Sequence, residues 1–307
     1  MSNSTSAFIA IIGRPNVGKS SLLNKMLGQK VAIVSDKPQT TRTRIMGVYT
    51  KDSEQMVFVD TPGFHKPRNI LGENMMKAVG TGISDVDGVI LVIEASTKFK
   101  NLDDAIPPAE QELISEIKKR NLKAFLVINK IDLLSQKDDL LDIISKYTKH
   151  HNFEGVIPVS AKDGDGVSLI LKEMRVFLKP SVHYFDDEDV TDQSEKTMVA
   201  EMIREKLLRH LDKEVPHGIA IEIERFFERD LASGEPIIEI EATVYCEKST
   251  HKGIIIGKGG EMLKRVGFAA RRSIEDFFGT KVNLKLWVKV KEDWRNRQGL
   301  IHSFGLD

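Results

Sequence analysis

The strongest constraint on this chain lies near its start, where residues 13–20 read GRPNVGKS. An apolar run at residues 7–12 comes directly before this pattern, and the apolar spacing of an amphipathic helix follows it from Lys19 to Leu27. A G-x-x-x-x-G-K-[ST] pattern between a buried strand and a helix is typical of a phosphate-binding loop. We therefore interpret it as more than a turn that happens to contain glycines.

The residues of this loop have the chemistry that phosphate binding needs. Gly18 allows the backbone to approach a phosphate closely, and N–H groups of the loop then face the phosphate at the positive end of the helix. Lys19 adds a positive charge for the terminal phosphates, and the Ser20 hydroxyl is placed to ligate Mg²⁺. We expect nucleotide contacts from Gly13, Asn16, Val17, Gly18, Lys19, Ser20 and Ser21.

Strand and helix patterns alternate after this loop. The pattern predicts strands at residues 54–59, 87–93, 123–128 and 155–159, and a helix at 109–119. Such alternation is typical of an α/β domain with a doubly wound, mostly parallel sheet. Ligands of these sheets bind at the carboxyl ends of the strands. Residues 29–44 have neither the periodicity of a helix nor that of a strand, and we predict a mobile loop there.

Two motifs follow the ends of predicted strands. Asp60-Thr-Pro-Gly63 ends the strand at 54–59, where a carboxylate beside the phosphate-binding loop would be directed at a metal ion. Taken alone, this motif is typical of a tight turn. Asn129-Lys-Ile-Asp132 ends the strand at 123–128, and alone it would more often be a helix-capping loop.

Asp132 carries the predicted choice of base. A carboxylate accepts two hydrogen bonds and donates none, which fits the adjacent N1–H and 2-amino donors of guanine and not the acceptor at N1 of adenine. The stem of Lys130 can lie across the purine, and Asn129 can connect neighbouring loops. A backbone N–H of Ser160, Ala161 and Lys162 is within reach of the guanine O6.

The ordered set GRPNVGKS, Thr41, DTPG, NKID and SAK resembles the P-loop GTPases over residues 7 to about 180. The segments PNVGKS and QTTR are similar to the Era branch of the Era/TrmE/EngA group. The resemblance implies that Thr41 contacts Mg²⁺ and the γ-phosphate, that Asp60 holds a water on Mg²⁺, and that the Gly63 amide senses the γ-phosphate. The metal set is then Ser20, Thr41 and Asp60, and the catalytic set is Lys19, Thr41 and Gly63.

Position 64 departs from the pattern of Ras-like GTPases. Phe64 stands where many GTPases carry a glutamine that orients the attacking water, and a phenyl ring cannot do this. An apolar residue is usual here in Era-like enzymes, and Asn16 is associated with a K⁺ ion that supplies positive charge. Asn16 is equally suited to be only a turn former. The resemblance implies slow, Mg²⁺-dependent hydrolysis of GTP that K⁺ stimulates.

The last third of the chain has a second pattern. Residues 181–197 are acidic and lack periodicity, which indicates a linker. The order that follows is helix, strand, strand, helix, helix, strand, and it includes IIIGKGG at residues 254–260; in the long helix we expect Leu263, Val266, Ala270, Ile274 and Phe277 to face inward. This order resembles a smaller α+β domain of the type II KH class. We predict a GTPase domain at 1–180, the linker at 181–197, and a KH domain with a C-terminal tail at 198–307.

The KH resemblance implies binding of RNA. Residues 248–297 hold thirteen Lys or Arg against five Asp or Glu, whereas residues 183–247 hold seven against eighteen. Both blocks are also compatible with solvated faces, and a lone G-x-x-G is by default a helix-entry turn. In KH domains this loop lets a nucleic-acid backbone pass close by. The RNA-binding candidates are Lys252, Ile254, Ile255, Ile256, Gly257, Lys258, Gly259, Gly260, Lys264, Arg265, Arg271 and Arg272.

Length and composition indicate the number of domains and the cellular compartment. Its 307 residues predict about two domains, and its net charge of zero does not by itself identify a partner. The single cysteine, Cys246, predicts a reducing compartment. The first dozen residues have no basic leader, and no apolar run approaches 20 residues, so we expect a cytoplasmic protein. We also expect it to be a monomer. Peripheral contact with the inner face of the cell membrane is left open.

We therefore expect a GTP-binding and GTP-hydrolysing switch with an RNA-binding domain. The resemblance implies guanine nucleotide, Mg²⁺ and K⁺ as ligands. It also implies that the protein binds ribosomal RNA of the small subunit near its 3′ end and acts in maturation of that subunit. One alternative is an RNA-binding adaptor that binds GTP without significant turnover. Another is the GTPase component of a tRNA-modifying complex, although no segment suggests a modification domain.

Overall fold

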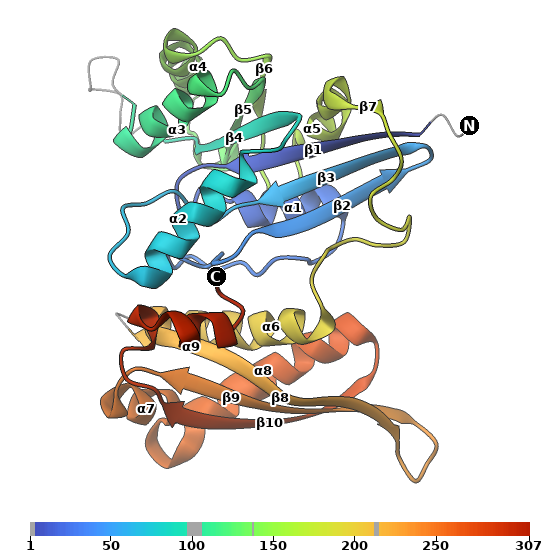
Figure 1. The fold of residues 1–307 in the computed structure, drawn as a ribbon, viewed down its shortest axis with the longest axis vertical. Coiled ribbons are helices and arrows are strands. Elements are labelled where there is room, and N and C mark those ends of the chain that lie inside the picture. The colour runs from blue at the N-terminus through green and yellow to red at the C-terminus, as the bar shows by residue number, and fades with distance from the viewer. Residues whose placement is uncertain (1–3, 97–105, 137, 212–214) are drawn as a thin grey trace. The chain divides into compact units, whose positions relative to one another are not determined.

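The computed structural model describes residues 4–96, 106–136, 138–211 and 215–307 (Figure 1). The chain divides into two compact units. The first comprises Met1–Ala32, Thr41–Pro67 and Met75–Asp192, and the second comprises Ile33–Thr40, Arg68–Asn74 and Gln193–Asp307. Two short segments of the N-terminal half thus belong to the second unit.

The first unit is built on one sheet with β1 near its middle. The strand order is β2-β3-β1-β4-β5-β6, and β7 pairs antiparallel with the start of β1. From β3 to β6 all neighbours are parallel, whereas β2 pairs antiparallel with β3 at the edge. The strands are β1 (Thr5–Ile12), β2 (Ile45–Lys51), β3 (Glu54–Asp60), β4 (Gly88–Glu94), β5 (Ala124–Asn129), β6 (Gly155–Pro158) and β7 (Lys179–Pro180).

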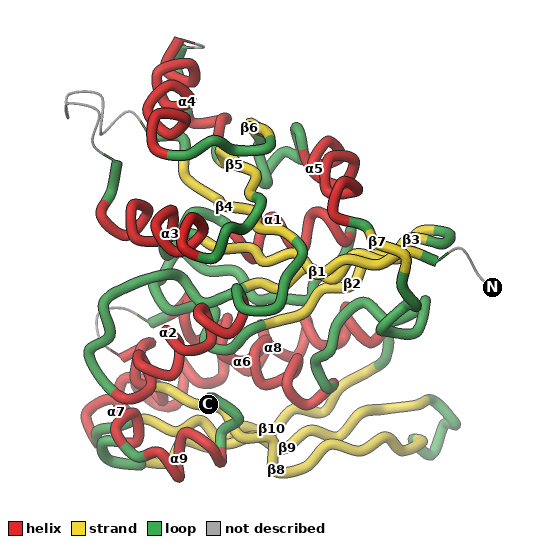
Figure 2. The backbone as a smooth tube through the Cα atoms, turned by 45° about the horizontal axis from the view of Figure 1, so that its top comes forward, coloured by secondary structure: helices red, strands yellow, loops and turns green. Residues whose placement is uncertain are grey.

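Helices cover both faces of this sheet (Figure 2). Successive side chains of a strand point to opposite faces, so Ile9 and Ile11 of β1 join one core cluster while Ala10 and Ile12 join another. The first cluster includes residues of α1 (Lys19–Leu27) and α5 (Val167–Glu173); the second includes residues of α2 (Ile70–Gly82), α3 (Pro108–Lys119) and α4 (Asp138–His150). The predicted doubly wound, mostly parallel sheet is confirmed.

The carboxyl ends of the central strands lie together at one edge of the sheet. The chain passes from β1 to β3 on one side and then returns to β4 on the other side of β1. Such a reversal of strand order marks the place where ligands bind in open α/β sheets. The motifs that follow β1, β3 and β5 therefore lie at one place.

The acidic stretch after β7 makes fixed contacts within the first unit. The Gln55 side chain accepts hydrogen bonds from the backbone N–H groups of Tyr184 (2.8 Å) and Phe185 (3.1 Å), and it donates one to the Phe185 carbonyl (3.0 Å). The Tyr184 ring packs edge-on against Phe8. This part of the predicted linker thus packs along the sheet of the first unit.

The second unit contains the predicted order of helices and strands. Its sheet has the order β10-β9-β8, with β8 antiparallel and β10 parallel to β9. Helices α6 and α8 supply most of the apolar side chains that pack on this sheet. The elements are α6 (Glu195–His210), β8 (Ile219–Asp230), β9 (Pro236–Cys246), α7 (Ser249–Ile256), α8 (Glu261–Phe278), β10 (Lys281–Val290) and α9 (Gln298–Ser303). The predicted smaller α+β domain is confirmed.

The prediction of burial is wrong for one residue of α8. Val266, Ala270 and Ile274 are buried as expected, but Phe277 is 41% exposed. Its neighbour Phe278 packs against the core instead. Both residues satisfy helical spacing from Ile274, at i+3 and i+4, so periodicity alone could not choose between them.

Within the described ranges, the structure has no helix both long and apolar enough to span a bilayer.

Candidate functional site

The turn between β1 and α1 exposes the first backbone N–H groups of the helix. Gly18 lies at the N-cap of α1 with φ of 96°, and among the described residues no side chain caps this end. A Cβ atom on Gly18 would lie 2.3 Å from Nδ2 of Asn129, so only glycine fits. An uncapped helix start with open N–H groups is suited to bind an anion.

Lys19 lies buried inside this turn. Its ammonium donates hydrogen bonds to the carbonyl oxygens of Gly13 and Arg14, each at 3.1 Å. Burial lowers the pKa of Lys19 to about 8, and the nearby carboxylate of Asp60 opposes that shift. An anionic phosphate at this position would favour the charged ammonium.

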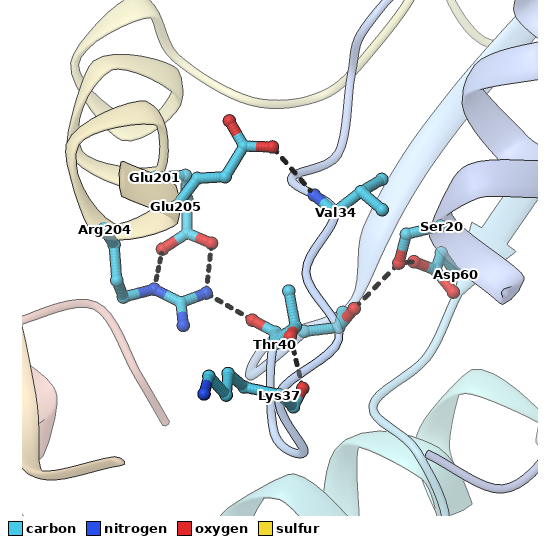
Figure 3. Close-up of polar contacts among 9 residues, drawn as sticks. Ser20, Val34, Lys37, Thr40, Asp60, Glu201, Arg204 and Glu205 are labelled. Carbon is cyan, nitrogen blue, oxygen red and sulfur yellow. Dashed lines mark hydrogen bonds and ion pairs between the residues drawn. The ribbon is translucent and has the colours of Figure 1, made fainter. Parts of the chain in front are cut away.

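Three side-chain oxygens gather beside the turn. The Ser20 hydroxyl donates to Oδ2 of Asp60 at 2.6 Å (Figure 3). It also lies 2.9 Å from the hydroxyl of Thr41. The other Asp60 oxygen, Oδ1, is buried and has no hydrogen-bond partner among the described residues. Burial raises the pKa of Asp60 to about 6, although Lys19, both hydroxyls and the Thr61 backbone oppose this shift.

This donor set fits a magnesium ion. Hard oxygen donors are the ligands that Mg²⁺ prefers, and an unpartnered buried carboxylate oxygen is costly without a cation. A divalent cation here would also favour the ionised form of Asp60. The structure brings together the predicted metal residues Ser20, Thr41 and Asp60.

The loop after β3 packs directly on the phosphate-binding turn. A Cβ atom on Gly63 would lie 2.6 Å from Cα of Pro15, and the Phe64 N–H donates to the Gly13 carbonyl at 3.1 Å. The Phe64 ring packs against the apolar core beside the sheet. Position 64 therefore offers no polar group to a water molecule.

Asn129 connects three loops at the predicted base site. Its amide donates to the Val17 carbonyl at 2.8 Å, and its Oδ1 accepts from the Ala161 N–H at 3.0 Å. The Ser160 hydroxyl donates to Oδ1 of the exposed Asp132 at 2.9 Å. These bonds hold the Asn129-to-Asp132 motif against the turn at 160–162. Lys162 is exposed beside it, and Lys130 pairs with Glu94 at 3.3 Å.

A buried network at the phosphate-binding turn was not predicted from the sequence. Arg14 Nε lies 2.5 Å from Oε1 of Glu110, and the Tyr147 hydroxyl donates to Oε2 of the same carboxylate. Glu110 is fully buried. It shares a face of α3 with Leu113, Ile114 and Ile117, so a carboxylate at an apolar position of the helix was the available signal.

In the second unit, a glycine turn joins α7 to α8. Gly257, Gly259 and Gly260 have φ of 75°, 59° and 81°, and nothing lies within 4 Å of a Cβ built on Gly259 or Gly260. The turn therefore leaves open space at the N-terminus of α8. Such space and backbone geometry suit the close approach of a phosphodiester backbone.

The RNA-binding candidates differ in exposure. Ile254 is 51% exposed, whereas Ile255 is fully buried in the core of the second unit. Ile255 therefore supports the fold beneath this surface. The charged candidates that are exposed are Lys258, Lys264, Arg265, Arg271 and Arg272, while Lys252 and Ile256 are half-buried.

One further residue of this surface was not predicted. The Phe268 ring is 58% exposed on α8, and the guanidinium carbon of Arg271 lies 5.6 Å from its centre. An exposed aromatic ring beside arginine is a surface on which unpaired bases stack. The signal was an aromatic residue within the basic part of an amphipathic helix.

Comparison with known proteins agrees with both parts of this description. A family model described as a 50S ribosome-binding GTPase matches residues 8–130, and a KH-domain model matches residues 214–295. A GTPase Era of Clostridioides difficile (strain 630) is 46% identical over 300 residues and 98% of each chain. A GTPase Era of Ruminiclostridium cellulolyticum is 48% identical over 302 residues, which cover 98% of this chain and 97% of that protein.

A solved structure is similar over the whole length. It is described as Era in complex with MgGDPNP and nucleotides 1506–1542 of 16S ribosomal RNA. It matches with a TM-score of 0.91 and 33% sequence identity, and the match covers 99% of both chains.

Proposed function

This chain belongs to the Era family of GTPases, and from that premise we propose that it hydrolyses GTP and binds small-subunit ribosomal RNA. The proposal of GTP hydrolysis rests on one observation. The oxygens of Ser20, Thr41 and Asp60 gather beside an uncapped helix start. The RNA half is supported by the KH-domain match and by the relative solved with a 16S fragment. The proposed role is in assembly of the small ribosomal subunit, as a monomer in the cytoplasm.

We propose that Ser20 and Thr41 hold Mg²⁺ directly and that Asp60 holds it through a water molecule. When bound there, Mg²⁺ would supply positive charge that offsets the charge of the phosphates. The backbone of Gly13, Asn16, Val17 and Gly18, with Ser21, holds the phosphates, and Lys19 offsets their charge. In this arrangement the chain positions the reactants and stabilises developing charge, which is most of what catalysis of phosphoryl transfer requires.

The attacking water is oriented by backbone groups in this proposal. We expect the Gly63 amide and Thr41 to face the γ-phosphate, because the Gly63 loop packs on the phosphate-binding turn and the Thr41 hydroxyl lies 2.9 Å from Ser20 Oγ. The apolar ring of Phe64 leaves no side chain at that position to orient the water, so turnover is slow. We propose that Asn16 helps to hold a K⁺ ion, which supplies charge where other GTPases use arginine.

Guanine is selected by Asp132, whose carboxylate accepts from the two adjacent donors of the base. Asn129 and Ser160 hold this motif in place, and Lys130 covers the purine. Ala161 and Lys162 belong to the turn that faces the guanine O6. The RNA surface is the glycine turn of residues 257–260 with the exposed cations of α8.

Steady-state release of phosphate tests the catalytic half. We expect the full-length chain to turn over many molecules of GTP with Mg²⁺, and Lys19→Ala to lose this activity because one of the positive charges that face the phosphates is then missing. Phosphate release that stops at one equivalent per chain would instead favour the RNA-binding adaptor. Phe64 is the observation that favours this alternative, because it stands where many GTPases carry a glutamine that orients the attacking water.

A further inference from the structure

The segment that precedes Thr41 is bonded to helix α6. The Val34 N–H donates to Oε1 of Glu205 at 3.3 Å, and Arg209 donates to the Val34 carbonyl at 3.1 Å. At the other end of the segment, Nη2 of Arg204 donates to the Thr40 carbonyl (Figure 3). Residues 33–40 belong to the same compact unit as α6.

Arg204 is held in one orientation. Its side chain is only 2% exposed, and Glu201 on the preceding turn of α6 accepts from Nε at 2.7 Å and from Nη2 at 2.5 Å. A bidentate pair between a guanidinium and a carboxylate fixes the plane of both groups. The Nη2 donor is thus directed at the Thr40 carbonyl.

The Thr40 carbonyl is part of the peptide unit that leads into Thr41. A peptide unit is planar, so fixing this carbonyl also fixes the Thr41 nitrogen and restricts its Cα atom. The Thr41 hydroxyl lies 2.9 Å from Ser20 Oγ, at the proposed metal site. Residues 28–44 form no helix or strand, so backbone hydrogen bonds of regular structure do not hold Thr41.

We propose that Arg204 is a positioning residue for GTP hydrolysis, which places the Thr41 hydroxyl at the metal site by holding the Thr40 carbonyl. The inference rests on the proposed function of Thr41. Helix α6 packs its apolar side chains, including Val199, Ile203 and Leu207, in the core of the RNA-binding unit. Helix α6 therefore belongs to the same unit as residues 33–40, which it holds.

The test is the Mg²⁺ dependence of GTP hydrolysis by full-length Arg204→Met, which keeps an unbranched apolar stem and removes the donors. We expect the Mg²⁺ concentration for half-maximal rate to rise about fivefold and kcat to fall about tenfold, because Thr41 is no longer held. Nucleotide affinity in EDTA should stay within about twofold of the unaltered chain. A general loss of stability would lower the nucleotide affinity in EDTA as well as the rate, so it would not leave that affinity unchanged.

Three further variants make the result decisive. Lys196→Ala changes an exposed residue of the same helix and should behave as the unaltered chain. Arg204→Lys should recover part of the Mg²⁺ dependence, since one ammonium can still reach the carbonyl. Thr41→Ala should raise the Mg²⁺ requirement at least as much as Arg204→Met does.

The outcomes separate the two claims. An unchanged Mg²⁺ requirement in Thr41→Ala would overturn the proposed metal site itself. A shifted requirement in Thr41→Ala, together with normal behaviour of a folded Arg204→Met, would overturn the role of Arg204. Circular dichroism establishes folding. If Arg204→Met does not fold, Glu201→Ala replaces it: Glu201 is partly exposed, and its loss should raise the Mg²⁺ requirement by freeing the guanidinium.

Discussion

Asp132 presents an exposed carboxylate that only a neighbouring hydroxyl, Ser160, orients among the bonds described. Replacing it by an amide would place an N–H₂ group against a guanine donor. We expect Asp132→Asn to lose roughly 2 to 4 kcal/mol of GTP affinity, and to bind xanthosine triphosphate, which has an acceptor there. Titration with fluorescent nucleotides measures both affinities. Equal binding of ATP and GTP by the unaltered chain would refute the guanine assignment.

Glu110 illustrates the cost of separating buried partners. Arg14→Ala would leave its carboxylate, which is fully buried, with the Tyr147 hydroxyl and without the paired cation. We expect Arg14→Ala to lower the free energy of unfolding by roughly 3 kcal/mol. Tyr147→Phe removes one hydrogen bond and should cost about 1 to 2 kcal/mol. Urea unfolding compares the two, and a larger loss in Tyr147→Phe would contradict the account.

The sequence reveals single residues only where the chemistry is local. Lys19, Ser20 and Asp132 belong to short motifs, so their type and spacing are enough to suggest their roles. The partners of Arg14 and Arg204 lie 96 and 164 positions away, at Glu110 and Thr40. No periodicity of one segment predicts such pairs, because the fold brings them together.

At the scale of elements, the phosphate-binding turn and the loop after β3 determine turnover. Because the Phe64 ring packs against the core and offers no polar group to a water molecule, Phe64→Ala should change turnover far less than Lys19→Ala or Thr41→Ala. Replacing Na⁺ by K⁺ at constant ionic strength should increase turnover. Phosphate release measures both effects. Indifference to the cation would remove the K⁺ proposal and leave the rest of the site intact.

The glycine turn before α8 gives a second prediction for an element. Gly259→Asp puts a negative charge on the proposed phosphate path, at a positive φ that aspartate tolerates better than most residues. We expect RNA affinity to fall at least tenfold, about 1.4 kcal/mol, with GTP affinity within about twofold. A salt titration of RNA binding measures the effect.

Gly234→Asp is the matched control. Gly234 also has a positive φ, of 81°, with nothing within 4 Å of an added Cβ, and it lies in the turn between β8 and β9. The same charge there should leave RNA affinity within about twofold. An equal loss in both variants would indicate a general charge effect, and no loss in either would move the RNA site elsewhere.

Strong periodicity predicted most of the elements, although α4 also has it, at Leu140, Ile143, Ile144 and Tyr147, and was nevertheless not predicted. The buried parallel strands are continuous apolar runs, and the strands of the second unit alternate over part of their length, β8 only from Ile219 to Ile223. The sequence analysis did not predict β2, α2, α4 or α5. Strand β2 contains Gly47 and polar residues at a sheet edge, and α2 contains Gly72, Gly80 and Gly82, which weaken a helical pattern.

For the whole molecule, the order of motifs along the chain predicts the two folds. It does not predict which residues belong to each unit. Residues 33–40 and 68–74 belong with the C-terminal unit, although each lies among residues of the first. The acidic residues 181–192 pack along the first unit through Gln55 and Phe8. Such assignments depend on contacts between distant segments, and composition does not encode them.

The identity of the RNA bound in cells tests the central claim, that one chain joins a GTPase to a domain for small-subunit ribosomal RNA. The measurement is sequencing of RNA crosslinked to the full-length chain, to Gly259→Asp and to Gly234→Asp. The account predicts crosslinks concentrated near the 3′ end of the small-subunit RNA for the unaltered chain and for Gly234→Asp, and their loss in Gly259→Asp. Crosslinks spread over unrelated RNAs, or unchanged in a folded Gly259→Asp, would contradict it.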